Sequence, residues 1–190
     1  MKAKTLFFVV LLTMLVSLTG CGEKEDTNND DNGSNIASVT TAPDAVTTAS
    51  IVDDEAAFLN AISSNGTWII ATLNDLTIDQ DLLLEGEFKN GKKDDAGNDI
   101  IQRKVALYSQ DENRNITARY TLTAPKMTIT SPMASIQHGT FKGDLYVSVA
   151  NFKLIDTTVE GNVYFTSQEA QDTFTMDEES KITGTKELKQ

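Results

Sequence analysis

The side chains that could carry nucleophilic or acid–base chemistry are few in this chain. It contains one cysteine, Cys21, and one histidine, His138. Catalysis of the Ser-His-Asp or Cys-His type would need His138 as its base. His138 stands in the run Gln-His-Gly-Thr, which is typical of a turn, and no partner motif accompanies it. We therefore interpret His138 as a solvated loop residue, and we predict no catalytic residue.

The densest carboxylates are Asp75, Asp79 and Asp81, which lie within seven positions of one another. Clusters of oxygen ligands can hold calcium. No second acidic or basic motif accompanies these three residues, so we interpret them as solvated acids in a turn and keep them only as weak calcium candidates. The sequence predicts no metal site and no cofactor.

Two tyrosines, Tyr146 and Tyr164, occupy equivalent places in the runs Gly-Asp-Leu-Tyr-Val and Gly-Asn-Val-Tyr-Phe. Side chains alternate between the two faces of a strand, so apolar neighbours that point inward leave both tyrosines pointing outward. Adjacent outward aromatic rings form a candidate glycan-binding platform. The alternative is an ordinary cross-strand pair, which stabilises a sheet by ~0.2–1 kcal/mol.

A recurring pattern of apolar residues and glycines predicts the elements that position these tyrosines. Two apolar residues one apart, then a gap, then apolar-x-Gly, recur from Leu76, Met127, Phe152 and Phe174. The last three starts are 25 and 22 residues apart. A repeat of about this length is typical of a solenoid, in which each coil buries its apolar side against its neighbours. Glycines mark the expected bends of the coils and stand at Gly143, Gly161 and Gly184.

The repeat predicts an all-β fold, a short right-handed parallel β-helix with an N-terminal capping helix over 54–64. Residues 89–102 break the rhythm and carry Asn-Gly and Ala-Gly-Asn turns, so we expect an excursion from the solenoid there. A second polar turn is expected at 110–115. The competing fold is an antiparallel β-sandwich, which short periodic strands also fit.

Over about 53–185, this pattern resembles the right-handed parallel β-helices of the pectate-lyase-like kind, which often begin with a capping helix. Polysaccharide lyases of this fold use calcium-bound aspartates together with a basic residue as catalytic base. The present chain has no motif that matches that arrangement. The resemblance therefore implies the fold and leaves the activity open.

The front of the chain predicts an anchor. A basic start and an apolar run from Leu6 to Leu18 are typical of a secretory signal over 1–20. The run Leu18-Thr19-Gly20-Cys21 resembles the lipobox of bacterial lipoproteins, which implies that Cys21 is acylated and attaches the chain to the membrane, outside the cytoplasm. An uncleaved anchor and a plain secretory signal are the alternatives. Residues 21–50 have the composition of a disordered tether, which leaves 51–190 as the domain.

The net charge of −12 argues against a nucleic-acid partner and against electrostatic adhesion to anionic lipid. A single cysteine excludes a disulfide within the chain. The leading hypothesis is a non-enzymatic binding or structural lipoprotein, with cell-wall or host glycans as candidate ligands. A small lyase-like, polysaccharide-active enzyme is the alternative, and a self-assembling surface scaffold is a further one.

Overall fold

The computed structural model describes residues 49–189. The expected signal, Cys21 and nearly all of the expected tether lie outside these residues. The first strand begins at Ala49, so the ordered fold includes Ala49 and Ser50, which the composition assigned to the tether.

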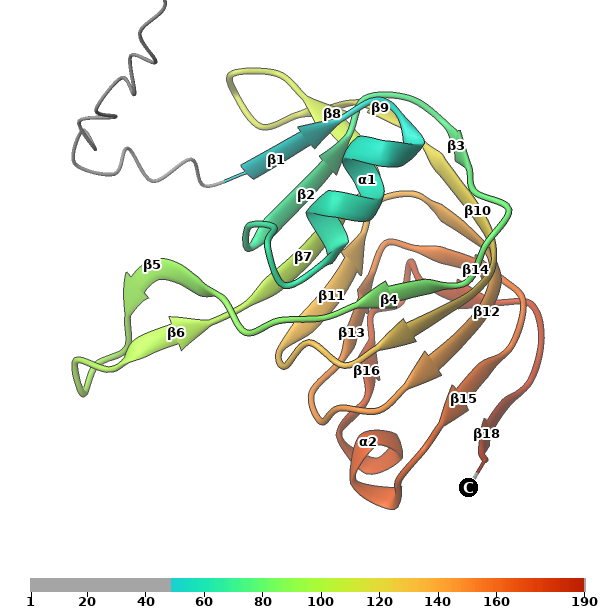
Figure 1. Cartoon of the computed structure of the whole chain (residues 1–190). Helices are drawn as coiled ribbons and strands as arrows, with labels where there is room; N and C mark the ends of the chain where they lie inside the picture. The colour runs from blue at the N-terminus through green and yellow to red at the C-terminus, as the bar shows by residue number, and fades with distance from the viewer. Residues whose placement is uncertain (1–48, 190) are drawn as a thin grey trace, which may run out of the picture. The chain divides into compact units, whose positions relative to one another are not determined.

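Two parallel sheets form the body of the fold (Figure 1). The first sheet has six strands, in the spatial order β1 (Ala49–Val52), β2 (Ile69–Thr72), β7 (Arg103–Ala106), β11 (Ala134–Gln137), β13 (Lys153–Ile155) and β16 (Thr175–Met176). The second sheet has eight strands, which are β3 (Leu76–Thr77), β4 (Leu82–Leu84), β10 (Thr121–Ile129), β12 (Thr140–Val147), β14 (Thr158–Glu160), β15 (Val163–Phe165), β17 (Lys181–Ile182) and β18 (Lys186–Leu188).

The chain crosses repeatedly from one sheet to the other, and every pairing within the two sheets is parallel. A parallel pair cannot be closed by a tight hairpin, because each strand must be reached by a crossover connection. The arrangement is therefore mostly β with all-parallel sheets, and it is consistent with a parallel β-helix. An antiparallel sandwich, the competing prediction, does not describe these sheets.

A bend divides the second sheet. Strands β10 and β12 continue through it, while β3 and β4 pair with successive halves of β10, and β14 and β15 with successive halves of β12. The predicted bend glycines lie here. Gly143 has φ +140, and a Cβ on Gly161 would meet the carbonyl oxygen of Gly143 at 2.0 Å. Stacked coils approach so closely at this bend that only glycine fits.

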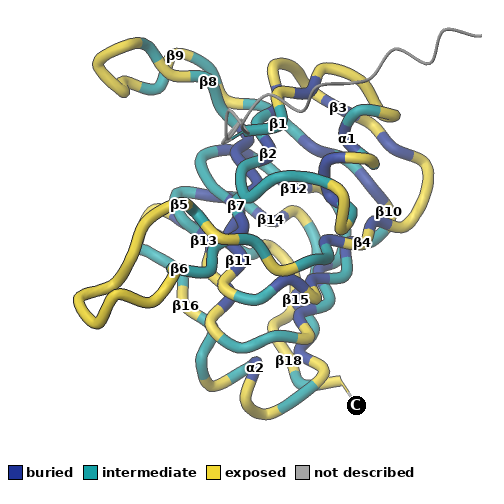
Figure 2. The backbone as a smooth tube through the Cα atoms, turned by 60° about the vertical axis from the view of Figure 1, so that its left-hand side comes forward, coloured by how far each residue is buried: buried dark blue, intermediate teal, exposed yellow. Residues whose placement is uncertain are grey.

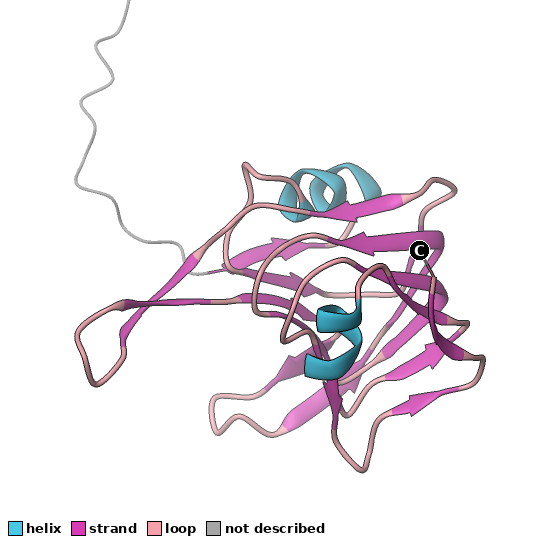
Figure 3. Ribbon diagram, turned by 90° about the horizontal axis from the view of Figure 1, so that it is seen from below, coloured by secondary structure: helices cyan, strands magenta, loops and turns pink. Residues whose placement is uncertain are grey.

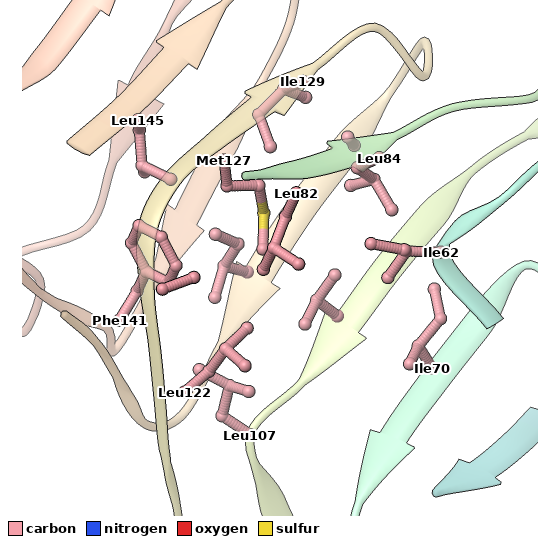
Figure 4. Packing of buried hydrophobic residues seen from close by; sticks show 14 of the residues in the cluster. Ile62, Ile70, Leu82, Leu84, Leu107, Leu122, Met127, Ile129, Phe141 and Leu145 are labelled. Carbon is pink, nitrogen blue, oxygen red and sulfur yellow. The ribbon is translucent and has the colours of Figure 1, made fainter. Parts of the chain in front are cut away.

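The core lies between the sheets and takes alternate residues of most of their strands, as the expected strand periodicity requires (Figure 4). Met127, Ile129, Phe152 and Leu154 are buried as predicted. The last repeat is looser, because its Phe174 and Met176 are only partly buried. Figure 2 shows buried segments concentrated on the strands and exposed ones in the loops.

A helix precedes the second strand, close to the predicted 54–64. It is α1 (Glu55–Ile62), and its N-terminus is capped by Asp54, whose carboxylate accepts a hydrogen bond from the backbone N–H of Ala57 at 2.8 Å. Phe58, Ala61 and Ile62 are its buried residues. The helix packs against β1, β2 and β4, at the N-terminal end of the core.

A second helix, α2 (Gln168–Thr173), follows β15 and has no counterpart in the sequence-based expectations. The Ser167 hydroxyl caps it by accepting a hydrogen bond from the N–H of Ala170 at 3.1 Å. Because the helix has six residues, it is too short to show a helical period in the sequence. Figure 3 shows both helices as short elements in a fold built of strands.

Two antiparallel hairpins leave the coils on either side of β7. The first, β5 (Lys89–Lys93) with β6 (Asp99–Ile101), is the excursion predicted over 89–102 and stands away from the sheets (Figure 1). The second pairs β8 (Tyr108–Gln110) with β9 (Ile116–Arg119) around the predicted polar turn.

Candidate functional site

The predicted tyrosine pair lies on the second sheet, where Tyr146 of β12 is the register partner of Tyr164 of β15. Their flanking residues are all fully buried, and these are Leu145, Val147, Val163 and Phe165. Alternation along each strand then directs both phenol rings outward. The ring centroids are 4.9 Å apart, the ring planes are inclined by 46°, and both residues are half-buried. The pair is thus a contiguous aromatic surface.

Two lysines border this aromatic surface. The ammonium group of Lys189 lies 4.3 Å from the ring centroid of Tyr164, and it donates a hydrogen bond of 3.3 Å to the Tyr146 hydroxyl. That hydrogen bond is the main reason why the pKa of Lys189 is raised. Lys126 lies 5.5 Å from the Tyr146 ring. The surface therefore combines aromatic faces with ammonium donors, in a protein that is acidic overall.

A polar ladder fixes the turn that precedes β15. The Asp144 carboxylate accepts hydrogen bonds from the backbone and side-chain N–H groups of Asn162, at 2.8 and 3.0 Å. The side-chain oxygen of Asn162 accepts in turn from the backbone N–H of Thr185 at 2.9 Å. Because Asp144 and Asn162 stand two residues before the tyrosines, the ladder sets the strand register that aligns Tyr146 with Tyr164.

The weak calcium candidates have separate roles in the structure. Asp75 accepts a hydrogen bond from the backbone N–H of Thr121 at 2.7 Å. Asp81 pairs with Lys126 at 2.8 Å, which is the main reason why the pKa of Lys126 is raised. Asp79 is exposed. Within residues 49–189, no group of three or more His, Cys, Asp or Glu side chains could share a metal ion.

His138 lies in the loop after β11, as expected, but it is only partly exposed and has a partner that the sequence did not reveal. Its Nδ1 lies 3.1 Å from the carboxylate of Asp156, which also pairs with Arg119 at 2.5 Å. The imidazole meets the ring of Tyr108 edge-on, with centroids 4.6 Å apart. His138 directly follows β11, and Asp156 directly follows β13 one coil later, with φ of +60 and +47. Their equal place in the repeat is the sequence signal that could have paired them.

The Asp156 carboxylate is the centre of this cluster. Its pKa is lowered, chiefly by the hydrogen bond from Arg119 and further by His138. An Asp that holds Nδ1 leaves Nε2 as the nitrogen able to exchange a proton. Among the described residues, Asp156 is the only hydrogen-bond partner of the imidazole, so no nucleophile is aligned with it. The contacts of Asp156 with His138 and Arg119 therefore link neighbouring coils.

Comparison of the chain with family models, curated proteins and solved structures gave no match. Within the described residues, no helix has the length and apolar character needed to cross a membrane.

Proposed function

We propose that this chain is a lipid-anchored, extracytoplasmic binding protein whose β-helix presents the Tyr146–Tyr164 surface to a glycan and catalyses no reaction. In this proposal the solenoid is right-handed, as parallel crossover connections are in ~98% of cases. Helix α1 covers its first coil. Without such a cover, the end of the stack would expose apolar residues to water.

The observation that carries the binding proposal is the contact between the two outward tyrosine rings. Their flanking residues fill the core, so core packing fixes the positions of the strands and directs the aromatic rings outward, with the flexible Lys189 side chain over the Tyr164 ring. A sugar ring has an apolar C–H face that can stack on such a surface, while its hydroxyls stay in water. The ammonium group of Lys189 would add a charge-assisted hydrogen bond to a carboxylate, whereas Lys126 is already paired with Asp81. An acidic glycan is therefore the ligand class that fits best.

The test is binding of the full chain to an array of acidic and neutral glycans. We expect the double variant Tyr146→Ala/Tyr164→Ala to lose most of its affinity, and Tyr146→Phe/Tyr164→Phe to keep it, because stacking needs the rings. Thr128→Ala is the matched control, since Thr128 is the neighbour of Tyr146 in the same outward row. Equal binding by wild type and the alanine variant would remove the tyrosines from the site, and binding to no glycan would favour a scaffold.

The anchoring proposal rests on the lipobox-like run and on the uniqueness of Cys21. Only a thiol can form the thioether to diacylglycerol, so Cys21→Ser should abolish labelling by a fatty acid and release the chain from the membrane fraction. Ser17→Ala is the control, because it leaves the run Leu18-Thr19-Gly20-Cys21 intact. Fatty-acid label retained on the Cys21→Ser variant would contradict the anchoring proposal.

The second candidate is a small polysaccharide-active enzyme, and the contact of His138 with Asp156 favours it. The two candidates separate in a turnover assay on acidic glycans, with and without calcium. An enzyme would release product that His138→Ala no longer forms. Our proposal expects binding without product, and the same glycan affinity in His138→Ala as in wild type.

A further inference from the structure

The outward face of the first sheet has a groove at its N-terminal end. Two outward rows are in register there, Ala49–Ile69–Lys104 and Ile51–Ala71–Ala106. The residues between these rows, Ile70 and Val105, are fully buried, which confirms that the rows point away from the core. Neighbouring strands thus carry Ala71 and Ala106 side by side, and their methyl groups form a floor lower than the surrounding side chains.

Larger side chains form the walls of the groove. Ile51 and Leu73 stand on one side with 66% and 49% of their surface exposed, values that are high for side chains of this size. The hairpin β8–β9 supplies the other wall through Tyr108, because β8 packs against β2. The groove is open to solvent and has a volume of about 290 Å³, close to the lower limit of ligand pockets. The groove therefore suits a small apolar ligand.

One cation stands in this groove without a carboxylate partner. Lys104 lines it, and its ammonium group donates a hydrogen bond of 2.8 Å to the Tyr108 hydroxyl. None of the ion pairs among the described residues includes Lys104. An apolar floor beside an ammonium group and a phenol hydroxyl complements a molecule with a hydrocarbon part and a carboxylate.

We propose that this groove binds a small, unbranched fatty carboxylate, with its hydrocarbon chain over Ala71 and Ala106 and its carboxylate at Lys104. The proposal is independent of the glycan surface, which lies on the other sheet. A second depression on the same face suits this ligand less. Its floor carries Ser135 and Gln137, whose side chains hydrogen-bond to each other at 3.0 Å.

The experiment is calorimetric titration of the full chain with butanoate, hexanoate and octanoate, and with 1-octanol. We expect affinity to rise about fourfold per added CH₂ group, as burial of hydrocarbon requires. Octanoate should bind more tightly than octanol in wild type. Lys104→Gln should bind octanoate about 10- to 100-fold more weakly, because a charge-assisted contact is lost, and octanol unchanged.

Two further variants locate the site. Ala71→Leu should abolish binding of all four ligands by filling the floor, with an unchanged melting temperature because the side chain points outward. Should Ala71→Leu fail to fold, Lys104→Gln still decides the question. Lys153→Gln is the matched control, since Lys153 lies two strands from Lys104 in the same outward row. An affinity that is independent of chain length, equal binding of octanol and octanoate, or equal effects of Lys104→Gln and Lys153→Gln would each overturn the proposal.

Discussion

Arg103 is a fully buried charged residue that ties α1 to the first sheet. Its guanidinium donates hydrogen bonds to the backbone carbonyls of Ala61 and Ser63, at 2.8 and 3.0 Å, and to that of Thr67. The ring of Phe88 lies 3.9 Å from the guanidinium carbon. Burial lowers the pKa of Arg103 to about 10, so the group is still charged at neutral pH. Carbonyls at a helix C-terminus lack partners within the helix and carry partial negative charge, which this cation satisfies.

Replacing Arg103 should therefore destabilise the fold strongly. We expect Arg103→Met to lower the free energy of unfolding by ~3 kcal/mol or more, since several buried carbonyls lose their donor. Lys142→Met, which removes an exposed pair with Glu160, should cost less than ~1 kcal/mol. Urea unfolding of both variants measures the difference, and equal losses would show that Arg103 does not hold the helix end.

Because of the cluster of Asp156, Arg119 and His138, we expect the stability of the fold to fall at acidic pH. The folded-state pKa of Asp156 is below its ordinary value of 3.8, so its contribution is present above that pH and is lost as the pH falls further. We expect Asp156→Asn to be less stable than wild type at about pH 5, with a smaller gap at about pH 3. Urea midpoints at the two pH values measure this gap, with Glu112→Gln as an exposed control. A gap that does not narrow would contradict the role of Asp156.

At the scale of elements, the two hairpins share one loop design. In the first, the Asp94 carboxylate accepts from the backbone N–H groups of Ala96 and Asn98, at 2.9 and 2.8 Å. In the second, Asp111 accepts from Asn113 and Asn115 at the same two distances. These hydrogen bonds lower the pKa of both aspartates, with the side chain of the loop asparagine as the largest cause. Each loop thus closes around a charged carboxylate.

The loops differ at the position that needs a left-handed backbone. The first has Gly97 there, with φ +85, and the second has Arg114, with φ +68. A residue with a side chain pays ~1–2 kcal/mol to adopt this conformation, and glycine avoids that cost. Part of the advantage of glycine is offset, because the unfolded chain has more conformational freedom at a glycine. We expect Arg114→Gly to stabilise the second hairpin by ~0.5 kcal/mol and Gly97→Ala to destabilise the first by ~1 kcal/mol. Amide hydrogen exchange at Asn98 and Asn115 measures the local stability of each hairpin. If both substitutions changed that stability in the same direction, the two loops would not share the expected preference for glycine.

The elements that the sequence predicts well are those whose residues recur in register. Tyr146 and Tyr164 could be paired because each stands between two core residues at the same place in the repeat. The contact of His138 with Asp156 depends on two turns with positive φ, which no apolar pattern reports. The role of Arg103 could not be predicted, because it directly follows a polar excursion and the sequence does not show that three backbone carbonyls surround its side chain. Short helices such as α2 cannot be predicted from hydrophobic periodicity, because they contain too few residues to show it.

At the scale of the whole molecule, stability comes from rows of inward residues stacked coil on coil. Val159 is fully buried and lies between Phe141 and Ile182 in one such row. Lys153 points outward from the first sheet and is exposed. We expect Val159→Asp to unfold the domain, because an unpaired carboxylate in this row costs several kcal/mol. Lys153→Asp should melt at nearly the wild-type temperature, and thermal melting of the two variants should therefore differ widely.

The strand partners between β12 and both β14 and β15 are separated by a constant 18 residues, and so are those between β11 and β13. A tandem duplication of 18 codons within this stretch would keep every bend glycine and every inward residue in its row. The gene could then lengthen the stack by one coil, ~4.8 Å, in a single genetic event without inventing a new loop. Selection on such a protein could act on its height in whole steps, leaving the chemistry of each coil unchanged.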